Sequence, residues 1–107
     1  MKFTVYLVED AEKDLVDLYR YVAQNDSAEK ADRFLDNLEQ TVFKLETMPG
    51  RGHSPPELEC IGVREYREIF YKPYRIIYRV KKSEVFVHCV LDGRRDLQDI
   101  LQSRVLR

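Results

Sequence analysis

The apolar residues of this chain change their spacing partway along the sequence, from a helical period to a strand period. In the first half they recur every three or four residues, which is the spacing of one face of an amphipathic helix. The residues on these stripes are Ala11, Leu15, Leu18, Tyr19 and Val22, and then Ala31, Phe34, Leu35, Leu38, Val42 and Leu45. In the second half apolar and polar residues alternate, as in half-buried strands. The sequence therefore predicts two long helices followed by a sheet.

Short polar and glycine-rich segments indicate where the two helices begin and end. Asp10 is placed to cap the first helix, and residues 25–26 (Asn-Asp) end it. Ser27 is placed to cap the second helix, which we expect to end at residues 48–50 (Met-Pro-Gly). Because the connection is tight, the two helices should run antiparallel as a helical hairpin.

The alternating segments predict four strands and one more helix. Phe3, Val5 and Leu7 mark the first strand, and residues 51–62 carry the Gly, Ser and Pro residues of an exposed loop. The later strands are expected at Arg64–Tyr71, Tyr74–Val80 and Val85–Leu91, with a short helix capped by Asp96 at the carboxyl end. Short connections make the last three strands an antiparallel meander, beside which the first strand must pair. The expected fold class is α+β with two layers, in which the hairpin packs on a mainly antiparallel four-stranded sheet.

Length and composition limit the class of protein. We expect residues 1–107 to form a single domain, because the chain is long enough for one core and too short for two. No apolar run approaches the roughly 20 residues that cross a bilayer, and no signal peptide is evident. We therefore expect a cytoplasmic protein with no membrane partner. Cys60 and Cys89 lie far apart without a CxxC spacing, which argues against a disulfide framework or a metal site, and no cofactor is expected.

Charge is distributed unevenly along a chain that is almost neutral overall. Residues 1–50 carry six Lys/Arg against eleven Asp/Glu, whereas residues 51–107 carry twelve against eight. The arginines of the second half are Arg51, Arg64, Arg67, Arg75, Arg79, Arg94, Arg95, Arg104 and Arg107. One interpretation is a face that binds an anionic partner. The other is a set of solvated strand edges whose cations pair with Glu65, Glu68 and Glu84.

Two segments carry a family resemblance, namely PYRIIYRV at residues 73–80 and LDGRRDL at residues 91–97. With the element order and the long hairpin, they make the chain similar to the RelE/ParE superfamily of toxins from bacterial type II toxin–antitoxin pairs. RelE-like members are metal-independent ribonucleases that cut messenger RNA on the ribosome. ParE-like members share the fold, inhibit DNA gyrase and stabilise plasmids. The resemblance implies a cognate antitoxin as partner, and either gyrase or the ribosome with its message as target.

Metal-independent RNA cleavage needs a base for the 2′-hydroxyl and a proton donor for the leaving oxygen. It also needs cations that stabilise the negative charge developing on the phosphorane. The residues available for this nuclease alternative are Arg64, Arg67, Arg75, His88 and Arg95. Leu101 stands where the resemblance would place a tyrosine, and no tyrosine follows Tyr78. Arginine is too weak an acid to replace that donor easily. We expect His88 to point away from Val87 and Cys89 and to lie beside Phe86 and Val90, where it would be an imperfect acid or base.

The proton-donor deficit favours a ParE-like toxin that acts by binding, with no favoured catalytic residue. The resemblance places the effector surface on the GRR turn and the final helix, at Arg94, Arg95, Leu97 and Leu101. Arg75 and Arg79 flank Ile77 on one face of a strand, a pattern that suits an acidic amphipathic peptide. We therefore expect Arg75, Ile77 and Arg79 to bind the antitoxin.

Overall fold

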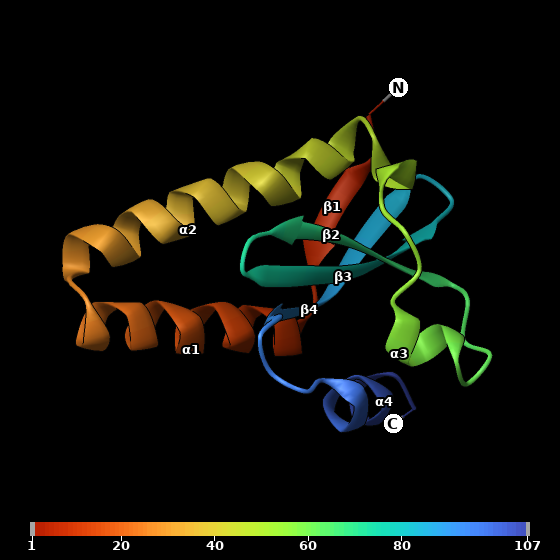
Figure 1. Cartoon of the computed structure of the whole chain (residues 1–107). Coiled ribbons are helices and arrows are strands. Elements are labelled where there is room, and N and C mark those ends of the chain that lie inside the picture. Colours follow the sequence, from red (N-terminus) through yellow and green to blue (C-terminus); the bar gives the residue numbers. More distant parts are fainter. Residues whose placement is uncertain (1, 107) are drawn as a thin grey trace.

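A computed structural model describes residues 2–106 of the chain. Its strands are β1 (Thr4–Leu7), β2 (Tyr66–Tyr71), β3 (Tyr74–Lys81) and β4 (Glu84–Asp92). Its helices are α1 (Glu9–Asn25), α2 (Ala28–Phe43), the short α3 (Pro56–Glu59) and α4 (Gln98–Leu106), with 3-10 turns at Lys44–Glu46 and Pro49–Arg51. The order of these elements confirms the predicted fold class (Figure 1).

The four strands form one sheet in the order β1-β4-β3-β2. β2, β3 and β4 are an antiparallel meander, as expected, and β1 pairs parallel to β4 at the edge, with Val5 opposite Val85. The parallel pairing follows from the hairpin, because α1 and α2 together carry the chain from the end of β1 back to the start of the meander.

Each face of the sheet has its own apolar cluster. On one face the α1–α2 hairpin covers Ile76, Tyr78, Val85 and Val87, and Leu38 of α2 is fully buried against them. On the other face α3 and α4 enclose a smaller cluster that includes Leu58, Ile77, Cys89, Leu97 and Leu101. Figure 1 shows the hairpin tip projecting beyond the sheet and α4 lying at the end of the sheet opposite the amino terminus.

Several predicted boundaries need correction. Helix α1 begins at Glu9, before the predicted cap Asp10, and its N-cap position makes no side-chain hydrogen bond. Ser27 does cap α2, because its Oγ accepts a hydrogen bond of 3.1 Å from the backbone N–H of Lys30. α2 ends at Phe43, earlier than expected, and continues as a 3-10 turn. The predicted loop at 51–62 contains α3, a single helical turn too short to show a periodic pattern.

A β-bulge in β4 changes the face to which its residues point. Ile77 pairs with Cys89 but the next residue, Tyr78, pairs with Val87, so His88 is an extra residue in the ladder. Val87 therefore faces the hairpin while Cys89 faces α4. The expectation that Val87 and Cys89 share a face is wrong, and so is the placement of Val90 beside His88, because Val90 lies buried under the hairpin.

Candidate functional site

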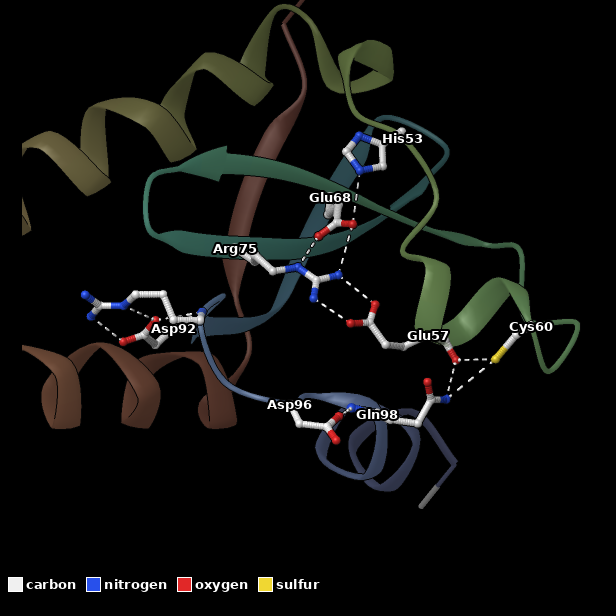
Figure 2. A network of polar contacts seen from close by, with 9 residues as sticks. His53, Glu57, Cys60, Glu68, Arg75, Asp92, Asp96 and Gln98 are labelled. Atoms are coloured by element: carbon white, nitrogen blue, oxygen red, sulfur yellow. Dashed lines mark hydrogen bonds and ion pairs between the residues drawn. The ribbon is translucent and has the colours of Figure 1, made fainter.

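Arg75, at the start of β3, lies at the centre of a polar network (Figure 2). Its guanidinium donates two hydrogen bonds to Glu57 of α3, at 2.6 and 2.7 Å, and two to Glu68 of β2, at 2.6 and 3.0 Å. The imidazole of His53 lies 3.1 Å from the same Glu68 carboxylate. Paired bidentate contacts of this kind are among the strongest hydrogen bonds in proteins, so Arg75 holds the 51–62 segment against the sheet.

Burial makes this network a structural one. The side chain of Glu68 is 1% exposed and that of Arg75 is 11% exposed. The hydrogen bonds from Arg75 hold the pKa of the Glu57 carboxyl below its usual value, and those from Glu57 raise the pKa of Arg75 further above its usual value. Gln98 extends the network to α4 by donating a hydrogen bond of 2.9 Å to the backbone carbonyl of Glu57.

These contacts correct part of the predicted antitoxin surface. The guanidinium of Arg75 forms hydrogen bonds with the carboxylates of Glu57 and Glu68. Its pairing with Glu68 agrees with the second interpretation of the basic half, in which the cations pair with nearby glutamates. Ile77 is fully buried beneath α3 and α4. Neither side chain is presented to solvent, because α3 and α4 cover this face of the sheet near the start of β3. Arg79 is half-buried, and it alone of the three stays accessible.

The GRR turn follows β4 and is fixed by Gly93 and Asp92. The backbone N–H of Gly93 donates a hydrogen bond of 2.8 Å to the carbonyl of Pro73, and a Cβ at Gly93 would lie 2.8 Å from that same oxygen. Asp92 accepts hydrogen bonds from the guanidinium of Arg94 at 2.7 and 3.0 Å, and this pairing lowers the pKa of Asp92. The exposed Arg95 side chain makes no hydrogen bond or ion pair with residues 2–106. It is therefore a free cation on a fixed turn.

α4 is held against the sheet by apolar and charged contacts. Leu97 and Leu101 are 1% and 0% exposed, so these two predicted effector residues face the core and can contribute only by holding α4 in place. Asp14 of α1 is an ion-pair partner of Arg104 and accepts a hydrogen bond of 3.0 Å from the backbone N–H of Val90. The β1–β4 ladder ends at the pair Leu7–Val87, so β1 offers no backbone acceptor to the N–H of Val90. The carboxylate of Asp14 takes that place.

The other residues of the nuclease alternative do not form one site with Arg75. Arg64 is exposed before β2, whereas Arg67 donates to the backbone carbonyls of Gly50 and Gly52. The ring of His88 packs edge-on against Tyr66, and burial, together with the nearby charge of Arg79, lowers its pKa. A histidine with a lowered pKa is neutral at pH 7 and a poor proton donor.

Two carboxylates central to this end of the molecule were missed from sequence. Asp14 falls on the apolar stripe of α1, between Ala11 and Leu15, and a carboxylate in that position is itself a signal of a buried ion pair. Glu57 gave no such signal, because it lies in a segment that looked like an exposed loop. Among residues 2–106, no cluster of three or more His, Cys, Asp or Glu side chains is arranged to hold a metal ion. Within the same residues no helix combines the length and apolar character needed to cross a membrane.

Comparisons with known proteins place the chain in a family. The model of the family described as "ParE toxin of type II toxin-antitoxin system, parDE" matches residues 5–97. Toxin ParE3 of Caulobacter vibrioides is 29% identical over 84 residues, which are 78% of this chain and 80% of that protein.

Two solved structures share the fold. A chain of the chromosomal ParDE system of Pseudomonas aeruginosa superposes with a TM-score of 0.70 at 20% identity, covering 83% of this chain and 94% of that one. A chain of the RelBE2 toxin–antitoxin complex of Mycobacterium tuberculosis gives 0.63 at 20% identity, covering 84% and 96%. The extent of the family match settles the assignment. This chain belongs to the ParE toxin family of type II toxin–antitoxin systems.

Proposed function

We propose that this toxin acts in the cytoplasm by binding DNA gyrase, with the GRR turn as its effector surface. The observation that carries the proposal is the state of Arg95, which is exposed and makes no ion pair or hydrogen bond with residues 2–106. Gly93 ties the turn to Pro73, so the cation projects from a fixed backbone. A preorganised arginine meets a carboxylate or a phosphate with little loss of conformational freedom.

Arg94 has a supporting part in this proposal. Its guanidinium is already paired with Asp92, although its side chain is 67% exposed. A partner carboxylate or phosphate would have to compete with Asp92 for it. We therefore expect Arg95 to contribute more to target binding than Arg94. Leu97 lies beneath the turn and would act by holding α4 in place.

The surroundings of the residues named for the nuclease alternative favour binding over RNA cleavage. Arg75 is neutralised by two carboxylates, so it has little charge left for a phosphorane. Arg67 is engaged by loop carbonyls, and His88 has a lowered pKa. A metal-free nuclease needs a proton donor beside free cations. Within residues 2–106, Arg64 and Arg95 remain free cations, but no proton donor is available beside them, because the lowered pKa of His88 leaves it neutral.

We further propose that a cognate antitoxin neutralises the toxin. The Mycobacterium tuberculosis relative was solved as a toxin–antitoxin complex, and the Pseudomonas aeruginosa relative is named as part of a ParDE system. Of the predicted antitoxin-binding residues, Arg79 retains an accessible guanidinium and is the one we expect to meet an acidic antitoxin segment.

A paired assay tests the target. The purified chain is incubated with gyrase and supercoiled or relaxed plasmid, and separately with ribosomes programmed with a defined message. We expect inhibition of supercoiling with the message intact, and we expect Arg95→Ala to lose most of that inhibition. Arg20→Ala is the matched control, because it removes an exposed arginine of α1 that is distant in sequence from the GRR turn. This variant should still inhibit supercoiling. Cleaved message with unimpaired supercoiling would refute the proposal.

A further inference from the structure

Four side chains form a row across the sheet, on the face opposite the helical hairpin. Tyr6 of β1 pairs with Phe86 of β4, Phe86 pairs with Arg79 of β3, and Arg79 pairs with Tyr66 of β2. Their sequence neighbours Val5, Val85, Val87 and Tyr78 pack under the hairpin, so the four members of the row point the other way. We call these four residues the cross-strand row.

The members of the cross-strand row are flat groups held against one another. The rings of Tyr6 and Phe86 stack with centroids 5.4 Å apart and planes 18° from parallel. The guanidinium carbon of Arg79 lies 6.0 Å from the ring centroid of Tyr66, which is buried beneath it. Because the Tyr6 and Phe86 rings stack on each other, each has one face left for a ligand. The row therefore offers a platform of those outer ring faces and the Arg79 guanidinium, which lies over the buried ring of Tyr66.

Tyr66 belongs to the buried cluster beside α3 and α4, whereas Tyr6, Phe86 and Arg79 lie outside that cluster. The buried cluster under those helices includes Ile77 and Cys89, whereas Arg79 lies two residues further along β3. Tyr6 is 44% exposed, and Phe86 and Arg79 are half-buried. This half of the face therefore presents the Tyr6 ring and parts of Phe86 and Arg79 to solvent.

Two nitrogen atoms at the platform have no hydrogen-bond partner. Arg79 Nε and His88 Nε2 are both buried and unsatisfied within residues 2–106. His88 is the extra residue of the bulge, and its ring meets Tyr66 edge-on with centroids 5.2 Å apart. Unsatisfied buried polar atoms carry a free-energy cost. Both atoms lie beneath the surface of the platform, so it is the exposed ring and guanidinium faces that a ligand would meet.

The charge around the platform favours an anionic ligand. Lys81 lies two residues beyond Arg79 on the same strand, and Arg64 lies two residues before Tyr66; both are exposed. The opposing charges are Glu84, which pairs with Lys81 in the ladder and lies beside Tyr6, and Glu65, which precedes Tyr66. Of the described residues, the three cations Arg64, Arg79 and Lys81 thus stand against these two carboxylates. Positive charge beside stacking surface is the combination with which proteins hold unpaired nucleic acid.

We propose that the cross-strand row is a binding platform for single-stranded nucleic acid, with bases stacked on Tyr6, Phe86 and the Arg79 guanidinium. Three inter-strand spacings of about 4.8 Å make the row roughly 14 Å wide, which is enough for two or three bases. Arg64 and Lys81 lie where a phosphate backbone would pass. Stacking uses the faces of the bases, so the platform should accept DNA and RNA alike. This inference goes beyond the proposed function, and it concerns a different part of the molecule from the GRR turn.

Fluorescence anisotropy of the purified chain tests the proposal directly. The probes are labelled oligothymidylate and oligouridylate of roughly a dozen nucleotides, and a DNA duplex of equal length, at about 100 mM salt. We expect both single strands to bind with similar affinity and the duplex to bind at least several-fold more weakly. A duplex that bound as tightly as the single strands, or a tenfold preference between the two sugars, would overturn the proposal.

Variants separate stacking from general electrostatics. Tyr6→Ala and Phe86→Ala should each weaken binding about fivefold or more, because each removes a stacking face. Tyr21→Ala and Phe43→Ala are the matched controls, since these exposed aromatics belong to α1 and α2, the helices that cover the opposite face of the sheet. They should leave the affinity unchanged. Equal losses in the row variants and the controls would overturn the proposal.

Two further measurements address charge and folding. Glu84→Gln should strengthen binding, because it removes the acid beside the platform. Arg79→Lys keeps the charge but loses the planar group, so it should weaken binding while preserving the Tm. Arg79 is also the residue expected to meet the antitoxin, so an acidic peptide can compete for it. Acidic-peptide binding that weakened on Tyr6→Ala and Phe86→Ala, while oligonucleotide binding did not, would overturn the proposal. None of these outcomes depends on whether the toxin inhibits gyrase.

Discussion

Replacing Arg75 by alanine should destabilise this protein more than any surface change. The substitution leaves Glu57 and Glu68 without the cation that neutralises them, and the Glu68 side chain is only 1% exposed. Removing one partner of a buried ion pair costs about 3–5 kcal/mol. A domain of this size has a free energy of unfolding of about 5–15 kcal/mol, so the loss should lower the Tm by roughly 12 °C or more.

Urea and thermal unfolding followed by circular dichroism would measure this loss. Arg95→Ala is the control, because its exposed and unpaired side chain should change the free energy of unfolding by less than about 0.5 kcal/mol. Adding Glu57→Gln to Arg75→Ala should cost little more, since it removes one of the two carboxylates that Arg75 neutralised and leaves only Glu68 unpaired by it. A loss below about 1 kcal/mol in Arg75→Ala would refute the structural role assigned to this arginine.

The same network makes stability depend on acid pH. Hydrogen bonds from Arg75 lower the pKa of Glu57 in the folded state, so the ionised carboxylate favours folding. This contribution is present above the unfolded pKa of about 4.3 and is lost as the pH falls through the lower folded value. Arg75→Ala should therefore lose less stability than the wild type between pH 5 and pH 3. An equal loss in both proteins would contradict this reasoning.

Three further predictions follow from other parts of the structure. Gly52→Ala should cost about 1–3 kcal/mol in urea unfolding, because a Cβ there would lie 2.4 Å from a backbone carbonyl oxygen, whereas Gly50→Ala meets nothing within 4 Å and should be neutral. Burial lowers the pKa of His88, so the folded protein resists protonating it; the Tm should fall as the pH drops below about 6.5, and His88→Gln should flatten that slope. Burial raises the pKa of the Cys89 thiol to about 11, so Ellman's reagent should modify exposed Cys60 first and reach Cys89 only on unfolding.

The elements of this fold could be predicted because local pattern and tertiary packing agree. The stripe on α2 buries Ala31, Phe34, Leu38 and Val42, and the alternation along β3 separates the two apolar clusters of the sheet. Each of those patterns repeats within a few residues. A sequence without any alignment was therefore enough to predict the two layers and the position of β1.

The ion pairs of the arginines could not be predicted from local sequence patterns. Arg75 pairs with a carboxylate 18 residues away on a helix of one turn, and Arg104 pairs with Asp14 across 90 residues. Such partners depend on how the chain closes in space. The bulge at His88 adds a second cause, since one extra residue reverses the face of everything after it. Four of the seven predicted antitoxin and effector residues are therefore largely buried, namely Arg75, Ile77, Leu97 and Leu101.

Arg95 now carries most of the predicted effector role, because Leu97 and Leu101 are buried and Arg94 is paired with Asp92. Because the expected effector role then falls mainly on one residue, a single substitution tests it. A single substitution at an exposed position should remove activity while leaving the free energy of unfolding nearly unchanged.

The most direct measurement is the topology of plasmid DNA from cells that produce this chain without an antitoxin. If the toxin holds gyrase, plasmid supercoiling should fall within the period of growth arrest, and cells producing Arg95→Ala should keep normally supercoiled plasmid. Growth arrest with fully supercoiled plasmid and fragmented messages would contradict the account, because the toxin would then be cutting RNA without inhibiting gyrase.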